Sequence, residues 1–222
     1  MKQVLKNASR VLLAFAALLG AIGVNAAEWD CAHTTSSNEY TLGTNCQISG
    51  GDVEVTTALE ITGNFTNLEN LVEVLAADNN RHFTVSSGTL TIRYLKLLGG
   101  RAENGGSIQL QQNSAATLNV YNSVFTENRN DIVNGVVKQN GKGGAIYSLY
   151  DVSGEAKSNT VNVYNSIFYN NGNGTKNGGA IFARTTKFNV QNSNFTNNGP
   201  TNNHGGAIKF HSSDGTIIGT SF

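Results

Sequence analysis

Apolar and glycine positions recur along this chain at a spacing much longer than one helical turn. A Gly-Gly-small-Ile run is followed by an Asn-Ser-x-Phe-x-x-Asn run, and this pair occurs three times before a fourth copy begins. The glycine pairs are Gly105-Gly106, Gly143-Gly144, Gly178-Gly179 and Gly205-Gly206. The serines of the second run are Ser123, Ser166, Ser193 and, in a degenerate final copy, Ser221. From Ser166 to Ser193 is 27 residues and from Ser193 to Ser221 is 28, a period that predicts stacked units.

Three columns of the aligned copies are apolar throughout. Alignment on the serines places in the first column Ile92, Val120, Val163, Val190 and Ile218. The second column contains Leu97, Phe125, Phe168, Phe195 and Phe222. The Gly-Gly run contributes Ile108, Ile146, Ile181 and Ile208. Positions beside these columns vary, as expected when successive side chains of a strand point to opposite faces. The columns therefore predict strands whose constant side chains face a core.

This repeat predicts an all-β fold. No leucine-rich helical periodicity follows the N-terminal segment, which disfavours helical solenoids. Each unit is expected to form one coil of a parallel β-helix, stacked about 4.8 Å above the preceding coil. Adjacent glycines suit corners where φ is positive and backbones approach closely. We expect Asn128, Asn171 and Asn198 to accept left-handed backbone geometry and to form a hydrogen-bonded ladder.

The first part of the chain has the features of a secretory signal peptide, predicted over residues 1–26. Lys2, Lys6 and Arg10 precede an apolar stretch from Val11 to Val24. A stretch of this length is shorter than the roughly 20 residues that a membrane-spanning helix needs. We therefore expect export, and no membrane span in this chain.

Two cysteines, Cys31 and Cys46, follow this segment closely. An exported protein can form disulfides, so we expect these residues to pair, with free thiols or a metal site as the alternatives. Residues 27–54 are predicted to form an N-terminal cap that contains this disulfide, and residues 55–222 a parallel β-helix. The last repeat stops at Phe222 before its closing asparagine, so the β-helix is expected to be C-terminally incomplete.

Two segments are longer than their counterparts in the next repeat. The extra residues predict outward loops near Arg129 to Gln139 and near Ser148 to Asn159. Loops on a rigid scaffold often carry recognition, although surface loops also accept insertions at little thermodynamic cost. Exposed aromatic side chains are expected on adjacent coils as well. The candidate binding surface comprises Tyr121, Tyr147, Tyr150, Asp151, Glu155, Lys157 and Tyr164.

Charge is balanced in this sequence, with 15 Lys and Arg residues against 15 Asp and Glu residues. This balance gives no electrostatic basis for nucleic acid or an anionic membrane surface as a partner. Only 14% of the residues are charged, against about 25% in an average domain. Solubility must therefore come mainly from Asn, Ser and Thr.

The two linked motifs also carry a family resemblance. The GGAI motif stands at Gly143–Ile146, Gly178–Ile181 and Gly205–Ile208, and the FxxN motif begins at Phe125, Phe168 and Phe195. Their combination resembles the passenger repeats of the chlamydial polymorphic outer membrane proteins over roughly residues 90–222. The resemblance implies a right-handed, single-stranded parallel β-helix that is displayed at the cell surface and used in adhesion. It carries over no catalytic residue and no cofactor.

Two classes of function are compatible with these features. The leading hypothesis is a secreted or cell-surface adhesin or interaction scaffold without catalytic activity, which binds an extracellular protein or glycan and needs no cofactor. The long flat faces of a solenoid and its exposed aromatic residues favour this class.

The alternative is a polysaccharide lyase or glycosidase. That chemistry needs two converging carboxylates, or an acidic Ca²⁺ site beside a basic residue. The acidic residues of the repeats form no column, and the only sets that could converge are Asp151 with Glu155, or Glu127 with Asp131 and Arg129. His204 and His211 flank the last glycine pair, but two histidines lack the third ligand that a metal site requires.

Overall fold

The computed structural model describes residues 27–32, 34–65, 70–130, 132–133, 136–137, 140–150, 158–172, 177–199 and 205–222. The predicted signal peptide, residues 1–26, lies outside these ranges. The described residues contain strands and connecting segments but no helix, and therefore no helix that could span a membrane.

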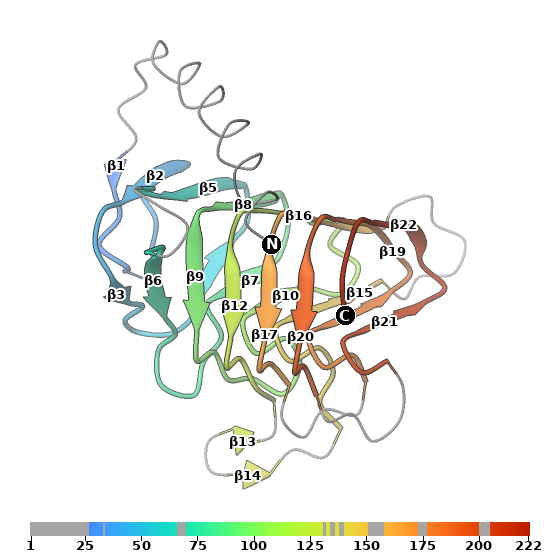
Figure 1. Cartoon of the computed structure of the whole chain (residues 1–222). Coiled ribbons are helices and arrows are strands. Elements are labelled where there is room, and N and C mark those ends of the chain that lie inside the picture. Colours follow the sequence, from blue (N-terminus) through green and yellow to red (C-terminus); the bar gives the residue numbers. More distant parts are fainter. Residues whose placement is uncertain are drawn as a thin grey trace, which may run out of the picture.

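Three parallel sheets form the walls of a β-helix, and the chain passes through them in a fixed order (Figure 1). The eight-stranded sheet contains, in spatial order, β1 (Ala27–Glu28), β2 (Glu39–Leu42), β5 (Ala58–Gly63), β8 (Thr89–Arg93), β11 (Thr117–Tyr121), β16 (Asn159–Tyr164), β19 (Thr186–Gln191) and β22 (Asp214–Ile218). The next wall, the phenylalanine sheet, contains β3 (Cys46–Gln47), β6 (Val72–Leu75), β9 (Leu95–Leu98), β12 (Val124–Thr126), β17 (Ile167–Tyr169) and β20 (Asn194–Thr196). The third wall, the glycine sheet, contains β4 (Val53–Val55), β7 (Phe83–Val85), β10 (Ile108–Leu110), β15 (Ile146–Leu149), β18 (Ile181–Arg184) and β21 (Ile208–His211).

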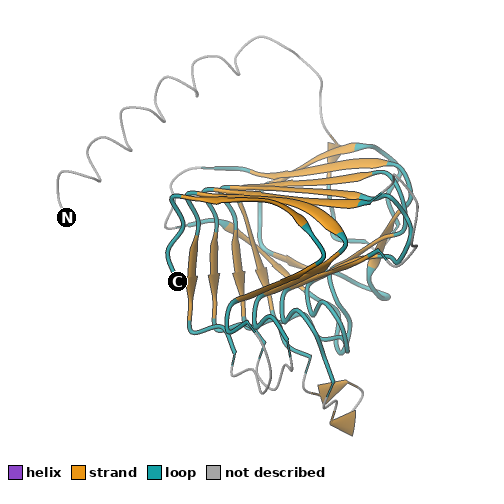
Figure 2. Ribbon diagram, turned by 90° about the vertical axis from the view of Figure 1, so that its right-hand side faces the viewer, coloured by secondary structure: helices purple, strands orange, loops and turns teal. Residues whose placement is uncertain are grey.

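Neighbouring strands of each wall come from successive coils, as Figure 2 shows from the side. Val120 lies opposite Val163, and Val163 lies opposite Val190, in parallel register. All three side chains are buried. The predicted all-β parallel β-helix is therefore confirmed.

A stack of phenylalanine rings fills the core beneath the phenylalanine sheet. The ring centroids of Phe125 and Phe168 are 4.6 Å apart, and those of Phe168 and Phe195 are 4.7 Å apart. These three rings are almost completely inaccessible to solvent. Phe222 continues the stack, with its centroid 5.5 Å from that of Phe195. The predicted phenylalanine column is thus continuous into the last coil.

The register of the last coil differs by one residue from the alignment on serines. Ile217 lies opposite Val190, whereas Ile218, which the sequence placed in that column, lies opposite Gln191. The serine position of the last coil is likewise filled by Thr220, whose Oγ1 accepts a hydrogen bond of 3.4 Å from the backbone N of Ser193. The residue equivalent to Ser193 is therefore Thr220, and the alignment on Ser221 is wrong by one residue.

The cause of this shift is the corner that precedes the serine position. In three successive coils this corner contains an asparagine in the left-handed region: Asn122, Asn165 and Asn192 have φ values of 49°, 50° and 49°. Gly219, with φ of 59°, is the equivalent residue of the last coil. The asparagine of the Asn-Ser pair makes the turn, and the serine hydroxyl accepts a backbone hydrogen bond from the coil before it, as in Ser123 N to Ser166 Oγ at 3.2 Å.

The two glycines of each Gly-Gly pair have different roles. The first glycine takes a positive φ, 62° at Gly143 and 63° at Gly178. The second glycine lies where coils approach closely, because a Cβ atom at Gly144 would overlap the carbonyl oxygen of Gly179. Both roles that the sequence predicted for the pair are therefore present, one at each residue.

The predicted asparagine ladder is present at the end of the phenylalanine sheet, beside the glycine pairs. Asn128 Nδ2 donates to Asn171 Oδ1 at 3.0 Å, and Asn171 Nδ2 donates to Asn198 Oδ1 at 2.9 Å. The left-handed residue, however, is the one before each ladder asparagine, namely Glu127 (φ 56°), Asn170 (φ 55°) or Asn197 (φ 53°). The ladder asparagines serve as buried hydrogen-bonding groups rather than as turn residues.

The predicted cap is itself built as a coil. Its strands β2, β3 and β4 pair in parallel with β5, β6 and β7 of the next coil. Cys31 and Cys46 form a disulfide, with Cα atoms 6.1 Å apart. Trp29 is buried in this coil, with its ring centroid 6.0 Å from that of Phe83. The disulfide therefore fastens the N-terminal end of the apolar core.

The first insertion projects outward where the sequence predicted it, and the second is shorter than predicted. The first contains an antiparallel hairpin of β13 (Ile132–Val133) and β14 (Val136–Val137), which projects away from the stacked coils (Figure 1). In the second, Ser148 belongs to β15 and Asn159 begins β16, so neither lies in a loop. This insertion is confined to residues 150–158, of which 151–157 lie outside the described residues.

Candidate binding surface

The outer face of the eight-stranded sheet carries polar side chains in straight columns. Alternate residues of each strand point into the core, so the intervening residues of successive coils line up on the outside. One outward column consists of Glu60, Thr91, Asn119, Asn162, Asn189 and Thr216. We call the outer face of this sheet the ladder face.

Hydrogen bonds connect this column from coil to coil. Asn162 Nδ2 donates to Asn119 Oδ1 at 2.9 Å, and Asn189 Nδ2 donates to Asn162 Oδ1 at 3.0 Å. Thr216 Oγ1 donates to Asn189 Oδ1 at 2.8 Å, and Asn119 Nδ2 donates to Thr91 Oγ1 at 3.3 Å. The amide groups are thereby held at a fixed orientation on the surface.

Tyr121 and Tyr164 form the adjacent outward column, as the sequence predicted for two exposed aromatic residues on adjacent coils. Their ring centroids are 5.2 Å apart and their planes differ by 11°. The guanidinium carbon of Arg93 lies 4.1 Å from the centroid of Tyr121, and Arg93 also forms an ion pair of 2.7 Å with Glu60. Both tyrosines are half-buried, so the stack is fixed by its neighbours and still reaches solvent.

Of the other predicted surface residues, Tyr147 and Tyr150 do not join this pair. Tyr147 and Tyr150 are 7% and 4% exposed and offer little area to a ligand. Tyr147 stacks on Phe182, with centroids 5.5 Å apart, and the backbone N of Tyr150 donates to the carbonyl of Arg184 at 3.0 Å. The remaining predicted residues, Asp151, Glu155 and Lys157, lie outside the described residues.

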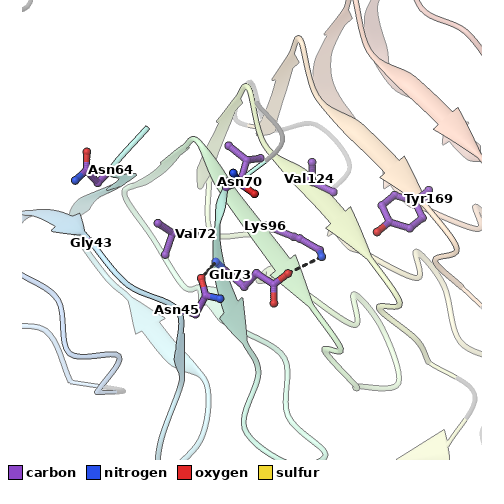
Figure 3. A pocket seen from close by; sticks show the side chains of 10 residues that line it. Gly43, Asn45, Asn64, Asn70, Val72, Glu73, Lys96, Val124 and Tyr169 are labelled. Atoms are coloured by element: carbon purple, nitrogen blue, oxygen red, sulfur yellow. Dashed lines mark hydrogen bonds and ion pairs between the residues drawn. The ribbon is translucent and has the colours of Figure 1, made fainter. Parts of the chain in front are cut away.

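A cavity of about 470 Å³ lies on the outer side of the phenylalanine sheet (Figure 3). No motif or repeat position in the sequence predicts it. Its lining residues are Gly43, Asn45, Asn64, Asn70, Leu71, Val72, Glu73, Lys96, Val124 and Tyr169. They come from several coils and from the connections between strands, so no single repeat position indicates this cavity.

The polar groups of this cavity bind largely to one another. Lys96 Nζ and Glu73 Oε1 form an ion pair of 2.6 Å, and Asn45 Oδ1 accepts a hydrogen bond of 2.9 Å from the backbone N of Glu73. The hydrogen bond with Glu73 raises the pKa of Lys96 above its ordinary value. The ion pair reduces the net charge that the cavity presents to a ligand, so we regard the ladder face as the stronger candidate.

Both carboxylate pairs considered for glycan cleavage include residues outside the described ranges. Glu127 is exposed at a corner, where its backbone is left-handed. Asp131, Asp151 and Glu155 lie outside the described ranges. Within those ranges, no group of three His, Cys, Asp or Glu side chains is arranged to hold a metal ion.

Comparisons with models of known families, with curated proteins and with solved structures found no significant match. The resemblance to the chlamydial passenger repeats stays a prediction that rests on the motifs.

Proposed function

We propose that this protein is a non-catalytic interaction scaffold, secreted or displayed at a cell surface, that binds an extracellular protein or glycan on the ladder face. The observation that carries the proposal is the hydrogen-bonded column through Asn119, Asn162 and Asn189, beside the Tyr121–Tyr164 stack. Adhesion is the form of binding that the family resemblance favours.

Pre-organisation is the physical reason for choosing this face. Ordering a flexible side chain on binding costs about 0.5–1.5 kcal/mol, and side chains that are already ordered avoid much of that cost. Asn162 uses one amide N–H and one oxygen lone pair in the ladder. An amide side chain has two of each, so one donor and one acceptor remain for a ligand.

The tyrosine stack adds a different kind of contact. The large faces of Tyr121 and Tyr164 pack against each other, while their edges and hydroxyl groups remain for a partner. Tyrosine is enriched among the residues that dominate binding energy, because it combines apolar area with a hydroxyl group. Together, the amides and tyrosines suit a ligand rich in hydroxyl or peptide groups.

A binding assay with paired variants tests this proposal. The full chain is applied to immobilised neutral polysaccharides and to matrix proteins such as collagen and fibronectin, and each bound ligand is retested with Tyr121→Ala/Tyr164→Ala. We expect this variant to bind at least about tenfold more weakly, as for central interface tyrosines. Tyr169→Ala is the control, because Tyr169 is also half-buried but lies on the phenylalanine sheet.

Two results would contradict the proposal. One is an equal loss of binding in the Tyr121/Tyr164 variant and the Tyr169 control, which would place the contact elsewhere. The other is the appearance of new reducing ends or unsaturated products from a bound polysaccharide, which would favour the glycan-cleaving alternative.

A further inference from the structure

A second, smaller cavity lies on the outer side of the glycine sheet, a different wall from the ladder face. Its volume is about 210 Å³, and its lining residues are Lys142, Asn177, Phe182, Arg184, Lys209 and His211. Strand pairing places Phe182 beside Lys209 and Arg184 beside His211 on β18 and β21. We call this cavity the basic pocket.

Positive charge is concentrated in the basic pocket. Among the six described residues that line it, three are Lys or Arg, a fourth is His, and none is acidic. In a chain with equal numbers of acidic and basic residues, this is a local separation of charge rather than a reflection of composition. Such a concave, one-signed site attracts ions of the opposite sign.

The two lysines are held in place by neutral groups. Lys142 Nζ lies 5.4 Å from the centroid of the Phe182 ring, and Lys209 Nζ donates to Asn177 Oδ1 at 2.8 Å. Neither contact neutralises the charge. A lysine ammonium has three N–H groups, so Lys209 retains two donors beyond its bond to Asn177.

The floor of the pocket strengthens this attraction. Phe182 is only 4% exposed and stacks on Tyr147, so the lysines lie beside a dry aromatic surface. Charges next to low-dielectric surface interact more strongly than charges surrounded by water. An oxyanion in this pocket would thus meet ordered cations with reduced screening.

We propose that the basic pocket binds the sulfate or carboxylate groups of an acidic extracellular polysaccharide. The pocket volume fits one charged substituent and part of its sugar, and the balanced charge of the chain provides no long basic track for a nucleic acid. The extracellular setting rests on the proposed function, whereas the pocket is a separate site on a separate wall.

Titration calorimetry at low ionic strength tests this inference on the full chain with dextran sulfate as the probe. Neutral dextran, inorganic sulfate and a single-stranded DNA oligonucleotide are the comparison ligands. We expect dextran sulfate to bind more tightly than each of them, and added salt to weaken binding because it screens the charges.

Lysine variants locate the site. Lys142→Gln and Lys209→Gln are each expected to weaken dextran sulfate binding by about three- to tenfold, the range for losing one partly exposed charge-assisted contact. Lys187→Gln is the matched control, because it removes the same charge from an exposed lysine on the eight-stranded sheet and should change affinity less than about twofold. Lys209→Arg should retain binding, since it keeps the charge.

Several outcomes would overturn the inference. One is an equal loss of dextran sulfate affinity in Lys187→Gln and Lys209→Gln. Another is binding of neutral dextran as tight as that of dextran sulfate, or tighter binding of DNA. A third is no binding of dextran sulfate by a wild-type chain whose β circular dichroism shows that it is folded. A site for small anions alone is indicated if inorganic sulfate competes fully at equal charge concentration. The tyrosine variants of the ladder face are expected to bind dextran sulfate normally, so this test can fail or succeed independently of the proposed function.

Discussion

Replacing Phe168 by alanine removes the middle ring of the core stack. Phe168 is 0% exposed and lies between Phe125 and Phe195 at centroid distances of 4.6 and 4.7 Å. Truncation of a buried phenylalanine typically costs about 3–5 kcal/mol, and each stacked aromatic pair adds about 0.5–1.5 kcal/mol beyond buried area. Since two stacked pairs are lost, we expect Phe168→Ala to reduce the free energy of unfolding by about 5 kcal/mol.

The neighbouring residue provides a control on the same strand. Ile167 points outward and is 43% exposed, so Ile167→Ala should cost less than about 1 kcal/mol. Urea unfolding measures both variants, with β circular dichroism for the whole chain and Trp29 fluorescence for the N-terminal coil. Similar losses for Phe168→Ala and Ile167→Ala would refute the assignment of these residues to the inside and the outside of the wall.

Three further perturbations test other parts of the fold. Gly144→Ala should lower the free energy of unfolding in urea by about 3 kcal/mol, because its methyl group would overlap the Gly179 carbonyl. Gly206→Ala, at the same repeat position with open space around it, should be nearly neutral. Equal effects of the two substitutions would contradict the close approach of coils at Gly144. Reduction of the Cys31–Cys46 disulfide, or replacement of both cysteines by serine, should lower the free energy of unfolding by about 3 kcal/mol. The measurement is the shift in the urea midpoint, and an unchanged midpoint would contradict the stabilising role of the disulfide at the N-terminal end of the core. Burial lowers the pKa of His82 to about 4 from 6.5, so the stability that depends on the neutral ring should be complete above pH 6.5 and decrease as pH falls towards 4. This loss of stability should approach about 3 kcal/mol and should be absent in His82→Gln. If His82→Gln keeps the same pH dependence, the loss does not come from protonation of His82.

The contacts that hold His82 explain why its protonation is costly. Its ring is fully buried, with Nε2 2.9 Å from the Val74 carbonyl oxygen and Nδ1 3.0 Å from Ser107 Oγ. The neutral ring can donate to the carbonyl through Nε2 and accept from the serine hydroxyl through Nδ1. Protonation would place a charge in the core and replace that acceptor by a donor.

The wall positions could be predicted from the sequence because every coil imposes the same physical requirement on them. Val163 and Val190, like Phe168 and Phe195, face a core that is closed from coil to coil, so only apolar residues fit. The serine column does not predict the last coil, because Thr220 occupies the serine position there. The corner depends on the residue with positive φ, and Gly219 fills that role without resembling the asparagines of the three preceding coils.

The binding surface was harder to predict because burial outside the core depends on neighbouring side chains. Tyr147 occupies an outward position, yet contact with Phe182 on the next coil and with the Gly105 corner leaves it almost inaccessible. The Asn119–Asn162–Asn189 column did carry a signal, since asparagine recurs two residues after a threonine or lysine in three coils. The basic pocket carried none, because the residue type changes from coil to coil at its repeat positions, as from Phe182 to Lys209.

The constant register between adjacent coils has a consequence for how such a molecule can change over generations. Val163 and Val190, and also Phe168 and Phe195, are 27 residues apart and pair directly. An in-frame gene duplication of 27 codons in this region would therefore insert one more turn whose two junctions match those already present. Unequal recombination could lengthen or shorten the protein in discrete steps of about 4.8 Å, without redesign of its cross-section.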